Sequence, residues 1–186
     1  MALTVSGLMT LGGETLRDPR GAARRLIDMG LPERARWEAL ALIVVLTGLV
    51  SGLIMLMMPP DPDAPPFNPL ASTFVQAGVV ALAVYAVHHV GRAFGGTGRL
   101  SDAVLLMAWL QTIMLGVQVV QIFAQMVIPA LGGLVLIAGI VLFIWLLVQF
   151  VMELHGFESA LKVMAGVIAT MMALGFVISM VLAPFL

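Results

Sequence analysis

The chain has 186 residues, of which 61% are hydrophobic and only 10% are charged, and its mean hydropathy is +1.11. A soluble domain carries about 25% charged residues, so this composition excludes a soluble globular domain and indicates a membrane protein. The chain contains no cysteine, which excludes disulfides, thiolate nucleophiles and cysteine-based metal sites. No basic stripe lies outside the regions that flank apolar segments, so nucleic-acid binding is not expected.

The first 30 residues precede the long apolar segments. We expect a flexible tail over residues 1–17, and no Lys or Arg precedes their apolar residues, which argues against a cleaved signal peptide. Residues 18–30 carry helix signals: Asp18 as the N-cap, Pro19 at the first helical position and Gly30 just past the end. The arginines and apolar residues between them favour a basic amphipathic helix on the membrane surface, with a solvated, partly helical tail as the alternative.

Five apolar segments follow, each long enough for the roughly 20 residues that cross the hydrocarbon layer. We place the membrane spans at about residues 39–58, 70–90, 103–128, 131–152 and 161–182. Trp37, just before the first of them, suits the membrane interface. The sequence therefore predicts an all-α, polytopic membrane protein, in which residues 31–186 form a domain of five transmembrane helices.

The basic residues predict the orientation of these spans. All nine Lys and Arg residues fall on one side: in the N-terminal segment, at Arg92 and Arg99 in the second connection, and at Lys162 next to the last span. The first connection, residues 59–69, is rich in proline and carries Asp61 and Asp63 but no basic residue. By the positive-inside rule we expect a cytoplasmic N-terminus and a C-terminus on the outer, periplasmic side.

The third span carries a row of glutamines within an arc of about 80° on one helix face. A polar side chain is costly against lipid, so this row should face other helices or water. Three interpretations remain open: hydrogen bonds between helices, a polar lining for a substrate path, and a seam between copies of the chain. The row consists of Gln111, Gln118, Gln121 and Gln125.

A second group of polar side chains lies at the predicted cytoplasmic ends of the helices. A network of ion pairs and hydrogen bonds that holds these ends is one interpretation. A metal site made by one histidine of the 88–89 pair with Glu153 and His155 is another, although no tight spacing such as HxxxH is present. The group consists of Glu38, His88, His89, Arg92, Asp102, Gln149, Glu153 and His155.

Glycines mark two further places. The run Gly95-Gly96-Thr97-Gly98 lacks the Lys of the phosphate-binding pattern GxxxxGK[ST] and follows no strand, so we interpret it as a flexible turn rather than a phosphate site. Gly48 and Gly52 form a GxxxG pattern in the first span. Small residues allow helices to approach closely, and we expect packing within the chain here rather than dimerisation.

Several local sequences together resemble bacterial members of the Yip1 family. They are Arg25–Pro32 (RLIDMGLP), the connection over residues 88–102, Ala108–Gln111 (AWLQ) and Glu153–Phe157 (ELHGF). The resemblance runs from about residue 20 to the C-terminus. It implies a five-helix protein of the bacterial inner (cytoplasmic) membrane that has no known enzymatic activity and acts through partners.

Three functional hypotheses follow. The first is a non-enzymatic integral membrane scaffold or adaptor, or an accessory subunit, that needs no cofactor and associates with the lipid bilayer and with other membrane proteins or itself. The alternative is a small oligomeric transporter or channel with a glutamine-lined path. A metal-dependent membrane enzyme at the cytoplasmic edge is the third.

Overall fold

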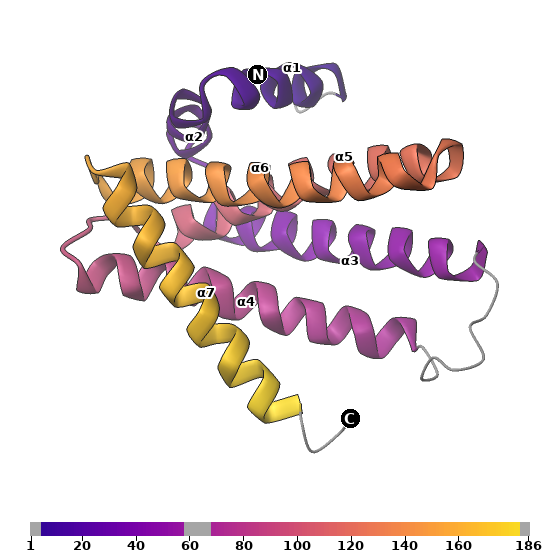
Figure 1. The fold of residues 1–186 in the computed structure, drawn as a ribbon. Helices are drawn as coiled ribbons and strands as arrows, with labels where there is room; N and C mark the ends of the chain where they lie inside the picture. The colour runs from indigo at the N-terminus through magenta and orange to yellow at the C-terminus, as the bar shows by residue number, and fades with distance from the viewer. Residues whose placement is uncertain (1–4, 58–67, 183–186) are drawn as a thin grey trace.

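The computed structural model describes residues 5–57 and 68–182. Within these ranges the chain is helical and contains no strand (Figure 1). The helices are α1 (Val5–Arg17), α2 (Pro19–Asp28), α3 (Glu33–Met57), α4 (Pro69–Ala93), α5 (Leu100–Val127), α6 (Pro129–His155) and α7 (Ala160–Leu182). Helices α3 to α7 are long and apolar enough to cross a membrane, which confirms the predicted all-α protein with five spans.

The five spans lie where the apolar segments predict them, but most of the helices are longer than those segments. Helix α3 begins six residues before its predicted span, α5 begins three residues before, and α4 and α6 each end three residues after. All these extensions lie on the same side, so the charged residues at the edge stand on regular helix. The proline-rich connection predicted over residues 59–69 lies almost entirely outside the described residues.

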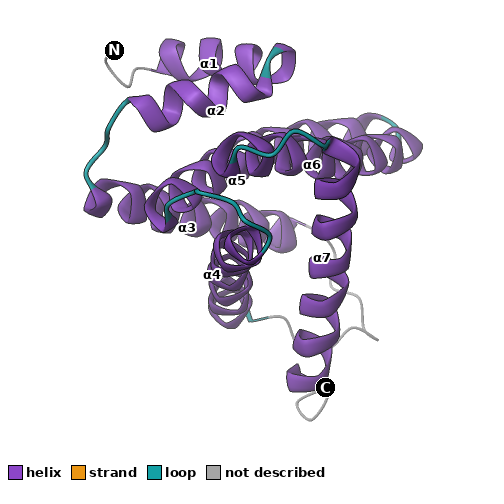
Figure 2. Ribbon diagram, turned by 90° about the vertical axis from the view of Figure 1, so that its left-hand side faces the viewer, coloured by secondary structure: helices purple, strands orange, loops and turns teal. Residues whose placement is uncertain are grey.

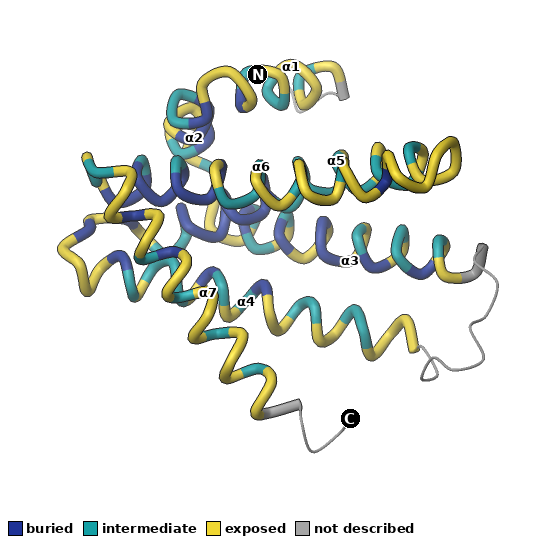
Figure 3. Tube along the Cα trace, viewed as in Figure 1, coloured by how far each residue is buried: buried dark blue, intermediate teal, exposed yellow. Residues whose placement is uncertain are grey.

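Helix α5 is the centre of the bundle and packs against both α6 and α3. Helices α1 and α2 lie on one side of α5 and α6, while α4 and α7 lie on the other (Figures 1 and 2). Buried side chains concentrate in residues 102–110 of α5 and 146–155 of α6, toward the polar end of the bundle (Figure 3). The part of the fold that is packed as a core is therefore the part next to the polar group.

Helices α3 and α4 approach closely at Gly48. A Cβ added there would lie 2.9 Å from Cγ2 of Thr73 and would also collide with its hydroxyl oxygen. A Cβ added to Gly52 would meet Pro69 at 3.6 Å, an ordinary van der Waals distance. The first glycine of the GxxxG pattern therefore serves packing within the chain.

The N-terminal segment differs from the flexible tail that we expected, because residues 5–17 form helix α1. Gly12 and Gly13 lower the intrinsic helix propensity of this segment, which is why the sequence gives only a weak helical signal. A tertiary contact offsets that cost: Thr15 is fully buried, and the indole N–H of Trp109 donates a hydrogen bond to its hydroxyl over 2.9 Å.

Helix α2 begins and ends where the sequence predicts. The Asp18 side chain accepts a hydrogen bond from the backbone N–H of Gly21 at 2.9 Å, Pro19 is the first helical residue, and Gly30 has a positive φ of 60°. The apolar side chains of Ala22, Ala23 and Leu26 are buried, and the helix packs on α5 and α6. The apolar side of this basic helix is therefore covered by protein.

Candidate functional site

The imidazole of His155, the last residue of α6, is enclosed by the glycines of the 91–98 segment. A Cβ added to Gly91 would lie 2.5 Å from Cδ2 of the ring, and one added to Gly96 would lie 2.6 Å from the Cβ of His155. A Cβ added to Gly98 would meet Cε1 at 3.0 Å. These glycines therefore make room for a side chain of the same chain.

Both ring nitrogens of His155 contact backbone groups. The N–H of Gly98 donates to Nδ1 over 3.3 Å, and Nε2 lies 3.1 Å from the carbonyl oxygen of Val87. Because Nδ1 accepts a hydrogen bond, it carries no proton. Nε2 then carries the ring proton and donates a hydrogen bond to the carbonyl oxygen, and the imidazole is neutral. The ring of Phe157 stacks against the His155 imidazole, with the two ring centroids 5.5 Å apart. His155 thus fastens the end of α6 to the connection between α4 and α5.

His88 and His89 lie on α4, close to this connection. Their ring centroids are 5.0 Å apart in an edge-on arrangement, and His89 also stacks on Tyr85 at 6.1 Å. His88 is partly buried, whereas His89 is exposed. The two adjacent histidines therefore point in different directions, as the 100° step of a helix requires.

Glu153 binds two arginines of α2. Its carboxylate accepts from Nε of Arg24 at 2.8 Å and from Nε of Arg20 at 3.3 Å. The hydrogen bond to Glu153 and its negative charge raise the pKa of the Arg24 guanidinium. Sequence reasoning placed Glu153 in the polar group but missed both partners, although an acidic residue at the end of a span is a signal that a basic partner lies nearby.

Arg36 and Asp102 form a buried ion pair between α3 and α5. Their exposed fractions are 7% and 9%, and Nη1 of Arg36 donates to Oδ1 of Asp102. Nε of Arg36 also donates to the carbonyl oxygen of Leu31 over 2.8 Å. Sequence reasoning missed Arg36 as the partner of Asp102.

These contacts surround a polar pocket of about 480 Å³ between α2, the start of α5 and the end of α6. Three arginines and three carboxylates line it, so the formal charges of its walls balance. The charged lining residues are Arg24, Arg36, Arg99, Asp28, Asp102 and Glu153. Arg99 forms no ion pair with the described residues.

Not all members of the predicted polar group come together. Glu38 is exposed and pairs with Arg34 one helical turn away, at 2.7 Å, apart from the others. Arg92 is exposed, and Gln149 is partly buried on α6 without a hydrogen bond to the described residues. The structure therefore joins Asp102, Glu153 and His155 to α2, α3 and the 91–98 segment, and leaves Glu38, Arg92 and Gln149 at the periphery.

The metal-site interpretation lacks a donor set in the structure. Both nitrogens of His155 contact backbone groups, and the Glu153 carboxylate is paired with two arginines. In the part of the chain that the structure describes, no three His, Asp or Glu side chains are grouped in a way that could hold a metal ion.

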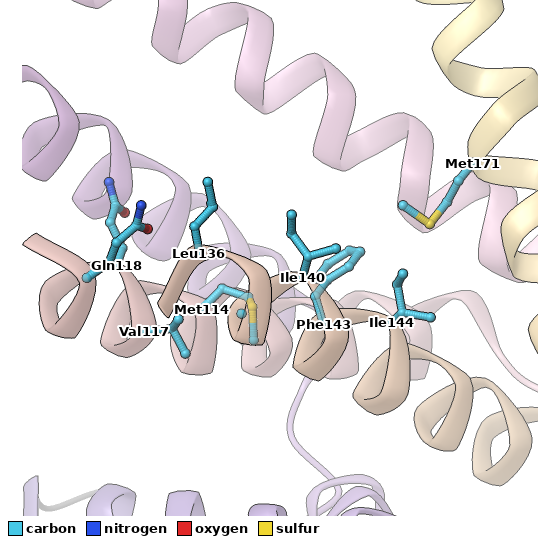
Figure 4. A pocket seen from close by; sticks show the side chains of 10 residues that line it. Met114, Val117, Gln118, Leu136, Ile140, Phe143, Ile144 and Met171 are labelled. Atoms are coloured by element: carbon cyan, nitrogen blue, oxygen red, sulfur yellow. The ribbon is translucent and has the colours of Figure 1, made fainter. Parts of the chain in front are cut away.

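The glutamine row divides into members with different surroundings. Gln118 donates from Nε2 to the Ser51 hydroxyl of α3 over 3.1 Å, an interhelical hydrogen bond. Gln118 and Gln121 also line a mainly apolar groove of about 300 Å³ between α5, α6 and α7 (Figure 4). Gln125 is exposed, and a Cβ added to Gly132 would lie 2.7 Å from its Cβ. Gln111 is partly buried outside the groove.

Comparison with known proteins gives one finding. No curated protein and no solved structure matches the chain. The family model of the Yip1 domain matches residues 13–182, which includes α2, all five spans, the 91–98 segment and His155. Because this match covers most of the chain, the protein belongs to the Yip1 domain family.

Proposed function

We propose that the protein is a non-enzymatic membrane scaffold or adaptor whose polar end binds membrane-protein partners. The main observation behind this proposal is that most of the polar side chains at that end bind other parts of the same chain. His155, Glu153, Asp102 and Arg36 bind other parts of the same chain and so fix the ends of α3 to α6 relative to one another. A fixed set of helix ends is what a docking platform requires, because a preorganised surface loses less entropy on binding.

The outward side of this platform offers groups for recognition. Phe94 follows the end of α4 and is 75% exposed, between Arg92 and Arg99, which form no ion pairs with the described residues. Aromatic residues, including Phe, and arginines are enriched at protein–protein interfaces. We place the protein in a bacterial inner membrane, with this side facing the cytoplasm and the C-terminus outside. The reason for this orientation is that all nine basic residues are assigned to this side.

The test is purification from the native membrane in mild detergent, followed by native mass measurement and identification of co-purifying proteins. The proposal expects a defined complex that Phe94→Ala weakens. Phe176→Ala is the matched control, because Phe176 is 66% exposed on the apolar part of α7. A protein recovered as single copies without any other polypeptide would contradict the proposal.

A second candidate is a small oligomeric transporter or channel, favoured by the two glutamines in the groove of α5, α6 and α7. Reconstitution into vesicles that contain a pH-sensitive dye tests this function as proton flux, with a K⁺ gradient and a K⁺ ionophore setting the membrane potential that drives it. If the path exists, Gln118→Leu combined with Gln121→Leu should abolish ion flux while the protein remains folded. Unchanged flux in the double variant would remove this candidate.

A further inference from the structure

The position of α1 along α5 places this helix at membrane depth. Thr15 is hydrogen-bonded to Trp109, and a Cβ added to Gly12 would lie 3.7 Å from Cδ1 of Ile113. Three residues toward the N-terminus of α1 thus correspond to four residues forward along α5. Helix α1 therefore runs antiparallel to α5, and its earlier residues lie farther from the polar end.

The depth follows from the rise of the α5 helix. Asp102 is the last charged residue of α5 and pairs with Arg36 at the polar edge. Trp109 and Ile113 lie seven and eleven residues beyond it, or about 10.5 and 16.5 Å at 1.5 Å per residue. Since half the hydrocarbon layer is about 15 Å thick, Gly12 stands near the level of the bilayer centre.

The exposed side chains of α1 fit such surroundings. Leu8, Met9 and Leu16 are exposed, and Met9 has 75% of its surface free. The described helix from Val5 to Gly13 has no charged residue, and its charges, Glu14 and Arg17, stand at the shallow end next to α2. Glu14 is paired there with Arg25 at 2.5 Å.

The two threonine hydroxyls of α1 are also satisfied without water. Thr10 donates to the carbonyl oxygen of Ser6 over 2.9 Å, and Thr15 donates to that of Leu11 over 2.7 Å. In hydrocarbon each polar group needs a partner in the protein, and these hydroxyls have one.

We propose that α1 is embedded in the hydrocarbon layer of the membrane, which it enters from the polar end, with Leu8, Met9 and Leu16 against lipid acyl chains. The five spans alone then do not make up the membrane-embedded surface. This inference does not depend on the scaffold function, because it concerns only where α1 lies. The proposal also explains the Trp109–Thr15 hydrogen bond, because this bond holds α1 against the bundle from the lipid side.

The experiment uses single nitroxide labels, because the chain has no cysteine and each introduced thiol is unique. Met9→Cys is labelled in the full chain, reconstituted in vesicles of phosphatidylcholine and phosphatidylglycerol. Leu46→Cys, at an exposed position of α3 ten residues beyond Arg36, is the lipid control, and Arg34→Cys, in the first turn of α3, is the water control. Collision rates with oxygen, which is apolar, and with a polar nickel complex are then measured for each label.

The expected result is a Met9 label with high oxygen collision, and with nickel collision about tenfold or more below that at position 34, because polar solutes partition poorly into hydrocarbon. Nickel collision equal to that at position 34 would place α1 in water and overturn the proposal. Low collision with both reagents would mean that protein covers α1, which would overturn it equally.

Discussion

Gly91 and His155 lie so close together that no side chain fits between them, since a Cβ on Gly91 would lie 2.5 Å from Cδ2 of the imidazole. The contact joins α4 to the end of α6. The ring is also held by Val87 and Gly98, so it cannot move aside without losing hydrogen bonds to backbone groups.

Gly91→Ala should therefore destabilise the protein by about 1–3 kcal/mol, the usual cost of overpacking a closely packed site. Gly78→Ala is the matched control, because Gly78 lies on the same helix with nothing within 4 Å of an added Cβ. Thermal unfolding in detergent measures both variants. Equal unfolding midpoints for the two variants would show that the His155 contact is not rigid.

The buried pair of Arg36 and Asp102 predicts a strong asymmetry between single and double substitutions. Asp102→Asn leaves the Arg36 charge buried without its partner, which should cost about 3–5 kcal/mol, whereas replacing both residues by Leu and Met should cost much less. Glu38→Gln removes one member of the exposed pair with Arg34 and should cost only about 0.5 kcal/mol. The free energies of unfolding of these variants are compared. A double variant that is destabilised as much as Asp102→Asn, or more, would contradict the expected asymmetry.

The positions of the spans could be predicted from the sequence, whereas their contacts could not. Apolar length fixed α3 to α7, and the Asp18-Pro19 pair fixed the start of α2, because these signals are local. The partners of Glu153, Asp102 and His155 come from residues far away in the chain, and one sequence does not reveal which distant residues meet.

The N-terminal helix α1 is the element whose local sequence signal is weakest. The two adjacent glycines oppose a helix, and only the spacing of Leu11 and Thr15 (i, i+4) indicates a common face. That face is the one that contacts the bundle, since Leu11 packs against the core and Thr15 binds Trp109. Tertiary contact therefore decides the structure of a segment whose local propensity is poor.

The position of α2 should depend on Glu153, which is its ionic link to α6. Glu153→Gln removes the charge that Arg20 and Arg24 share, and because Arg24 is exposed and Arg20 is only partly buried, the loss should be modest, about 1 kcal/mol. Hydrogen exchange of the α2 amides should become faster, while exchange within α6 stays unchanged. Glu158→Gln, an exposed acid beyond the end of α6, is the control, and equal exchange in both variants would show that apolar packing alone holds α2.

The bond between Gln118 and Ser51 tests whether the glutamine row holds helices together. Hydrogen bonds between membrane helices contribute about 0.6 kcal/mol on average and up to about 1.7, so a double-mutant cycle of Gln118→Leu and Ser51→Ala should give a coupling energy in this range. The same cycle with Gln111→Leu and Ser51→Ala should give none, because only Gln118 donates to Ser51. A coupling energy near zero for Gln118 would mean that its amide does not hold α3 and α5 together. The groove of α5, α6 and α7 would then be the more important surrounding of this side chain.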